Sequence, residues 1–259
     1  MTQALGKLYA LGVGPGASDL LTLRAVKLLQ HTDVIAIPEK KAGSYHSFAW
    51  DIVCGALEEE TMRGERLFLH FPMTKNSAVT IPAFQQAGSE ICARLKAGLD
   101  VLFITEGDPS VFSTWSYVLE EINEQLPEAV IDVVPAITSI TAVAAATGIP
   151  LGDGEERFCV VPATYGIEML PHLVEEFDTI LLMKVGRMIE PLKEILAQLD
   201  LLSCATYVSH ASMEQQQICR DLNEIPAENR YFSMVQISIR KRRGFLRNNS
   251  NAQTLEQAQ

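Results

Sequence analysis

Three turns in this sequence combine glycine, proline and small polar residues, and each follows a short apolar run. The turns are Gly14-Pro15-Gly16, Gly107-Asp108-Pro109 and Pro135-Ala136-Ile137-Thr138-Ser139. Glycine has no Cβ, so its backbone can approach a ligand closely, whereas Pro15 lacks an N–H that could bind an anion. Asp108 precedes a proline, which favours an extended backbone that presents the carboxylate. The first turn therefore predicts a small charged ligand other than a phosphate, and three such turns at strand ends indicate a shared cleft.

The first turn also has a competing interpretation. Gly12, Gly14 and Ala17 match the G-x-G-x-x-G/A pattern of dinucleotide-binding proteins. Such a site needs a helix N-terminus at the pyrophosphate and an acidic residue at the end of the second strand. Here the candidate helix caps, Ser18 and Thr22, come several residues late, and the nearby acidic residues fall before or beyond that position. An NAD-dependent oxidoreductase stays open as an alternative.

Short apolar runs alternate with helical segments along the chain, which is typical of α/β domains whose ligands bind at the carboxyl ends of strands. The predicted strands are 8–13, 34–37, 101–105, 130–134, 158–161, 179–184 and 204–209, with 231–239 as a late antiparallel strand. Predicted helices include 83–97, closed by Gly98, and 139–147, which ends at Gly148.

The length of 259 residues, with 47% apolar and 20% charged residues, allows two domains with cores of their own. We expect an N-terminal α/β domain over residues 1–114, a C-terminal α/β domain over 115–243 and a polar, frayed tail over 244–259.

Charge and cysteine content exclude several classes of protein. The net charge of −11 disfavours a nucleic-acid partner. No apolar run approaches the ~18 residues of a membrane span, and the N-terminus has no signal-peptide pattern, so we expect a cytoplasmic protein without membrane contacts. The five scattered cysteines form no C-x-x-C pair, which argues against a disulfide framework and a zinc ribbon; they are Cys54, Cys92, Cys159, Cys204 and Cys219.

The three turns, in their order and spacing, resemble the tetrapyrrole (corrin/porphyrin) methylases over residues 7–240. The motifs that carry the resemblance are Gly12-x-Gly14-Pro15-Gly16 with Leu21-Thr22-Leu23-Arg24-Ala25, then Gly107-Asp108-Pro109-x-Val111-Phe112-Ser113, then Pro135-Ala136-Ile137-Thr138-Ser139. The resemblance implies the class III methyltransferase fold, in which two α/β domains enclose a cofactor cleft. It also implies S-adenosyl-L-methionine (SAM) as methyl donor, S-adenosyl-L-homocysteine (SAH) as product, and a homodimer.

Where the motifs match, the resemblance implies residues that contact SAM. In the first two turns these are Leu11, Pro15, Gly107, Asp108, Val111 and Phe112. Thr138 and Ser139 would close the other side of the site, and Ala211 is a further contact. Met183 matches the apolar contact to the adenine, with a plain core methionine as the alternative. Glu106 stands where the family often has a glycine.

Two segments point to one subgroup of the family. The stretch Asp108-Pro109-x-x-Phe112-Ser113-Thr114 and the segment 43–49 resemble the precorrin-2 or cobalt-factor II C20-methyltransferases. The resemblance therefore implies methylation of C20 of a reduced tetrapyrrole in corrin (vitamin B12) biosynthesis. Enzymes that methylate other ring positions share the core motifs, so a different regiospecificity is an alternative.

Methyl transfer from SAM to an electron-rich carbon needs in-line positioning and exclusion of water, followed by loss of a proton. Asp108 is the predicted base or charge stabiliser, and its alternative role is to hold the turn and hydrogen-bond the cofactor. His46 and Tyr117 are further candidates, with a surface or core role as the alternative for each.

The implied substrate is an anionic tetrapyrrole, so local basic residues must meet its carboxylates. The candidates are Lys40, Lys41, Arg63, Arg66, Lys75, Lys184, Arg187 and the run Arg240-Lys241-Arg242-Arg243, each with a solvated surface role as the alternative. The five histidines lack ligand spacing, so we expect no protein-bound metal, and any cobalt would arrive inside the substrate. A noncatalytic tetrapyrrole-binding protein and a protein-modifying diphthamide methylase remain as other classes.

Overall fold

The computed structural model describes residues 4–226 and 231–239, and its contacts divide the chain into two compact units between Ser139 and Ile140. The predicted tail and the basic run 240–243 lie outside the described residues. Within the described part of the chain, no helix has both the length and the apolar character needed to cross a membrane.

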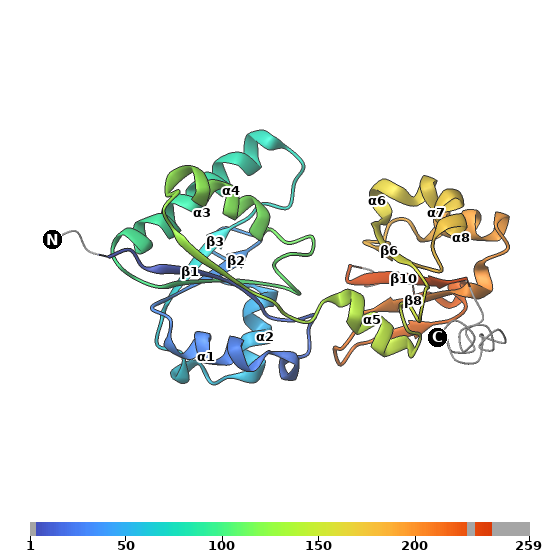
Figure 1. Cartoon of the computed structure of the whole chain (residues 1–259), viewed down its shortest axis with the longest axis horizontal. Coiled ribbons are helices and arrows are strands. Elements are labelled where there is room, and N and C mark those ends of the chain that lie inside the picture. Colours follow the sequence, from blue (N-terminus) through green and yellow to red (C-terminus); the bar gives the residue numbers. More distant parts are fainter. Residues whose placement is uncertain (1–3, 227–230, 240–259) are drawn as a thin grey trace, which may run out of the picture. The chain divides into compact units, whose positions relative to one another are not determined.

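The first unit is built on a parallel sheet with the strand order β3-β2-β4-β1-β5. Its strands are β1 (Lys7–Gly12), β2 (Val34–Glu39), β3 (Glu65–His70), β4 (Val101–Thr105) and β5 (Val130–Val134). Helices α1 (Leu23–His31) and α2 (Phe48–Ala56) cover one face, and α3 (Ser77–Lys96) and α4 (Trp115–Gln125) cover the other (Figure 1). Because the strands are parallel, all their carboxyl ends lie along one edge.

Strand β4 contributes side chains to two hydrophobic cores, one on each face of the sheet. Val101 and Phe103 pack with α3 and α4, whereas Leu102 and Ile104 pack with α1 and α2. Successive side chains on a strand point to opposite faces, so a strand covered on both faces reads as a continuous apolar run. This explains why β4 is fully buried and was predictable from sequence.

Two elements of the first unit differ from the prediction. Strand β3 was missed because it lies at the sheet edge and begins with the charged pair Glu65-Arg66, so it lacks a continuous apolar run. Helix α3 begins at Ser77 rather than at residue 83, because the side chain of Asn76 accepts a hydrogen bond from the N–H of Ala78 and caps the helix earlier.

The boundary between the units also differs from the predicted one at 114/115. Strand β5 pairs in parallel with β1, for example Leu11 with Val134, and α4 packs on α3. Residues 115–139 therefore complete the first sheet and its helical layer, and the division falls after them.

The second unit contains a mixed sheet with the order β6-β7-β10-β8-β9. Its strands are β6 (Phe158–Pro162), β7 (Thr179–Met183), β8 (Ala205–Ser209), β9 (Gln217–Cys219) and β10 (Ser233–Ser238). Strand β10 lies antiparallel between β7 and β8, which confirms the predicted late antiparallel strand. Helix α5 (Ser139–Thr147) covers one face, and α6 (Ala163–Gly166), α7 (Leu170–Glu176) and α8 (Ile189–Gln198) cover the other (Figure 1).

Candidate functional site

Three loops meet where β1, β4 and β5 end, and we call residues 12–16, 106–113 and 135–139 the carboxyl-edge loops. The first two are joined by a pair of backbone hydrogen bonds. The N–H of Gly107 donates to the carbonyl oxygen of Gly14 at 2.8 Å, and the N–H of Gly14 donates to the carbonyl oxygen of Gly107 at 3.2 Å. Gly14 has φ +86° and Gly107 has φ +66°, values that favour glycine.

Gly12 has a different role from the ligand approach predicted for the first turn. A Cβ at Gly12 would lie 2.4 Å from the carbonyl oxygen of Gly107 and 2.6 Å from the Cβ of Ala136. Gly12 is therefore the point where all three loops touch. By contrast, a Cβ at Gly107 would meet no atom within 4 Å, so the backbone of Gly107 faces open space that a ligand can approach.

Asp108 joins the second and third loops. Its Oδ1 accepts a hydrogen bond from the N–H of Ser110 at 2.8 Å, and its Oδ2 accepts one from the N–H of Ala136 at 2.7 Å. The side chain is buried, with an exposed fraction of 7%. These two hydrogen bonds fit the turn-holding role, the alternative to a catalytic one.

The segment after the first turn does not form a phosphate site of the dinucleotide type. A 3-10 turn at Ser18–Leu20 separates the glycines from α1, and α1 is capped by Thr22, whose Oγ1 accepts from the N–H of Ala25 at 3.1 Å. The N-terminus of α1 therefore begins well after Gly14, as the late caps indicated.

The other residues expected to contact SAM in the first unit have varied surroundings. Leu11 is completely buried in the core beneath α1 and α2, so its side chain is a core residue. Val111, Thr138 and Ser139 are half-buried. Phe112 is 54% exposed and has φ +50°, an unusual backbone for an aromatic residue.

The two predicted contacts in the second unit fall in one apolar cluster. Ala211 is buried beside Ala142 and Val143 of α5, and Met183, at the end of β7, packs half-buried against the same cluster. The structure thus brings Met183 and Ala211 together on the α5 face of the sheet.

Sequence reasoning missed a buried carboxylate that holds the loop after β2. Glu39 is 5% exposed, and its carboxylate accepts hydrogen bonds from the N–H of Gly43 at 2.7 Å, the N–H of Tyr45 at 2.9 Å and the Oγ of Ser44 at 3.3 Å. Tyr45 then packs edge-on against Phe68 at 5.2 Å between ring centroids. The segment Gly43-Ser44-Tyr45, with a glycine and a serine four and five residues after Glu39, is the sequence signal for this loop.

A second carboxyl group, which the sequence motifs did not indicate as a site residue, directly follows β4. Burial raises the pKa of Glu106, and the positive charge of Lys40, which follows β2, partly offsets that rise. Within the described part of the chain, Glu106 makes no hydrogen bond or salt bridge.

The weaker candidates have structural partners instead. His46 lies 3.5 Å from Asp51 in an exposed pair, and the ring of Tyr117 lies 5.0 Å from that of Phe84. Arg66 donates to backbone carbonyls of Glu59 and Met62. No group of three His, Cys, Asp or Glu residues in the described ranges is arranged to hold a metal ion.

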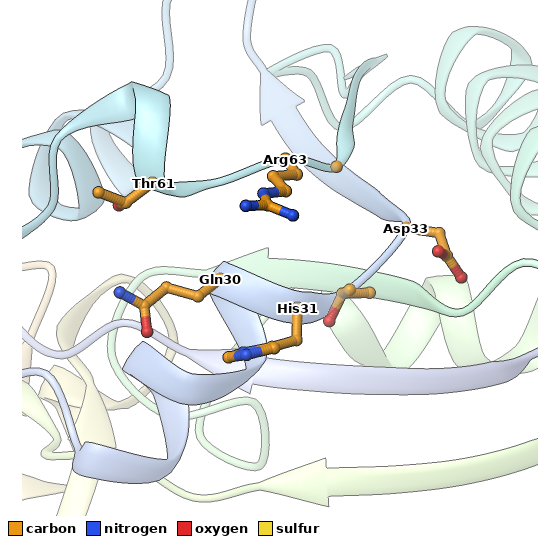
Figure 2. A pocket seen from close by; sticks show the side chains of 7 residues that line it. Gln30, His31, Asp33, Thr61 and Arg63 are labelled. Atoms are coloured by element: carbon orange, nitrogen blue, oxygen red, sulfur yellow. The ribbon is translucent and has the colours of Figure 1, made fainter.

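A polar depression of about 560 Å³ lies away from the carboxyl-edge loops. Figure 2 shows the residues that line it, which include Gln30 and His31 of α1 together with Asp33, Thr61 and Arg63. Asp33 directly precedes β2, so the depression lies at the amino end of that strand. It contains none of the residues expected to contact SAM.

Residues 7–226 match the family model described as Tetrapyrrole (Corrin/Porphyrin) Methylases. This chain belongs to that family. The match spans the first unit from residue 7 on and most of the second, so the expected family and its fold are confirmed, whereas the dinucleotide interpretation of the first turn gains no support.

Two curated methylases align with nearly the whole chain. The Cobalt-precorrin-2 C(20)-methyltransferase of Salmonella typhimurium is 35% identical, with 90% of this chain and 96% of the relative covered. The Precorrin-2 C(20)-methyltransferase of a Sinorhizobium species is 29% identical, with 89% and 94% covered. Among solved structures, the Uroporphyrin-III C-methyl transferase of Thermus thermophilus in complex with S-adenyl homocysteine superposes with a TM-score of 0.61 at 21% identity, covering 90% of this chain and 97% of that one.

Proposed function

We propose that this methylase transfers the methyl group of SAM to C20 of precorrin-2 or its cobalt-loaded form. The observation that carries the proposal is the joining of the three carboxyl-edge loops through Gly12, Gly107 and Asp108, in a chain whose full-length relatives are named for C20 methylation. The names of these relatives favour C20 over other ring positions.

The cofactor-binding residues we propose follow the geometry of each unit. In the first unit, the open space at Gly107 lets the adenosyl group or the methionine part of SAM approach the backbone, with Pro15, Val111, Phe112, Thr138 and Ser139 around it. In the second unit, Met183 and Ala211 offer an apolar surface suited to an adenine ring. Leu11 supports this site from the core, and Asp108 positions two loops rather than reacting.

The chain contributes little covalent chemistry of its own. SAM supplies an activated methyl group, so the protein has to orient it toward the ring carbon and exclude water. The carboxylates of the tetrapyrrole would be met by basic side chains after β2, where Lys40 and Lys41 lie. We propose that any cobalt is bound by the tetrapyrrole substrate and not by side chains of the protein.

We further propose a homodimer in the cytoplasm. All five cysteines are free, as expected for a reducing compartment.

Two measurements test this function. Calorimetry of the full chain should show micromolar SAH binding and no heat with NAD; tight NAD binding without SAH binding would contradict the proposal. Incubation with methyl-labelled SAM and precorrin-2, with and without cobalt, followed by NMR, should place the label on C20. A label on another ring carbon would retain the methylase and overturn the regiospecificity.

A further inference from the structure

Glu106 lies at the centre of the carboxyl edge of the first sheet. It directly follows β4, the third of five strands, so β1 and β2 flank it. β4 ends at Thr105, and Glu106 is the half-buried first residue of the second carboxyl-edge loop. It directly precedes Gly107, whose backbone faces open space.

The neighbouring strand brings one positive charge to Glu106. Strand β2 pairs with β4 in a register that aligns Ala36 with Phe103. That pair is the last one, and Glu39 and Lys40 follow at the end of β2 and directly after it. Glu39 is held by three donors of its own loop, which leaves Lys40 as the charged neighbour that acts on Glu106.

The carboxylates of Asp108 and Glu106, both in the second loop, therefore differ in their hydrogen bonding. Both oxygens of Asp108 accept backbone N–H groups that hold the loops, whereas Glu106 makes no hydrogen bond within the described part of the chain. Burial makes the Glu106 carboxylate a stronger base by raising its pKa, and Lys40 favours its ionised form.

We propose that Glu106 is the proton acceptor of the methyl transfer, an inference that rests on the proposed function. The methyl carbon forms its bond to the ring carbon as its bond to the sulfonium sulfur breaks, which leaves SAH neutral and the ring positively charged. The C–H bond of the methylated carbon then breaks, its electron pair returns to the ring system, and Glu106 takes the proton and later releases it to water. The same carboxylate stabilises the positive charge that forms before the proton leaves.

The test is single-turnover methyl transfer by Glu106→Gln with precorrin-2 and its cobalt form, beside SAH calorimetry and thermal unfolding. We expect the rate to fall by about 10²-fold or more, the scale of a lost general base, while SAH affinity stays within threefold of the wild type. Glu106→Asp keeps a carboxylate and should retain more of the rate. The exposed Glu120→Gln is the matched control and should leave the rate unchanged.

An isotope effect separates proton removal from a structural role. With deuterium on the C20 carbon, Glu106→Gln should show a larger primary isotope effect than the wild type, because proton loss becomes rate-limiting. A rate within threefold of the wild type, or a rate loss without any increase in the isotope effect, overturns the inference. A wild-type chain that binds SAH but methylates neither substrate overturns the proposed function, and this inference with it.

Discussion

At the scale of single residues, the environments of Asp108 and Glu106 show how neighbouring carboxylates acquire different tasks. Asp108 was predictable as a presented side chain because it precedes Pro109, but its two backbone partners were not, since Ala136 lies 28 residues away in sequence. Glu106 was read only as a departure from a family pattern. Its burial depends on the order of strands in the sheet, which no local pattern of the sequence contains.

Asp108→Asn should destabilise the chain by about 1–3 kcal/mol, because the amide has one acceptor oxygen and would turn an NH₂ group toward a buried backbone N–H. Denaturant unfolding followed by circular dichroism measures this change. Asp19→Asn, at an exposed position, is the control and should have little effect. Unchanged stability of Asp108→Asn would show that the two hydrogen bonds do not hold the loops.

Cys54 should react slowly with iodoacetamide. Burial and the nearby charge of Glu59 raise the pKa of Cys54 to about 11, so at pH 8 about one thiol in a thousand is ionised, and the rate should rise about tenfold per pH unit below that pKa. Glu59→Gln removes one cause of the rise and should speed alkylation. Mass spectrometry follows the modification, with the denatured chain as reference. Equal rates in the folded and denatured chain at pH 8 would contradict the expectation.

At the scale of elements, the carboxyl-edge loops are fixed by backbone hydrogen bonds between Gly14 and Gly107 and by the carboxylate of Asp108. The strands that lead into them were predictable because β1, β2 and β4 are buried on both faces and read as apolar runs. Edge strand β3 and the early start of α3 were not, because an edge strand can carry charges and a cap depends on one polar side chain.

Gly12→Ala should destabilise the chain by about 1–3 kcal/mol and weaken SAH binding, because its Cβ would push the Gly107 carbonyl and Ala136 out of place. Unfolding and calorimetry report the two effects. Gly148→Ala is the control: its Cβ meets nothing within 4 Å, although φ is +69°. That variant should lose about 1–2 kcal/mol of stability from the left-handed backbone and keep its SAH affinity. Equal loss of affinity in both variants would contradict the packing role of Gly12.

At the scale of the whole molecule, each unit has its own sheet and cores. In the second unit, hydrogen bonds of a buried glutamine also join the central strand to the end of α5. Gln236, in the middle strand β10, accepts from the Thr147 hydroxyl and donates to the carbonyl of Ile149 at 3.0 Å each. The sequence was sufficient to predict two α/β units but not where they divide. The division depends on β5 pairing with β1, more than a hundred residues earlier.

Sedimentation velocity of the full chain should give twice the chain mass of 28.5 kDa, because we propose a homodimer. Measurement over a hundredfold range of protein concentration separates a stable dimer from weak association. A species of one chain mass at every concentration would contradict the dimer and leave the methylase proposal standing.

The carboxylate of Glu39 has an evolutionary consequence. Two of its three donors are backbone N–H groups, so the shape of the loop depends little on which side chains the loop carries. Lys41 and His46 can therefore be exchanged by mutation without refolding the loop, provided that Glu39 and the left-handed Gly43 stay. A descendant of this protein could acquire a new preference among macrocycles by drifting at these positions alone, and a library randomised there is the place to look for one.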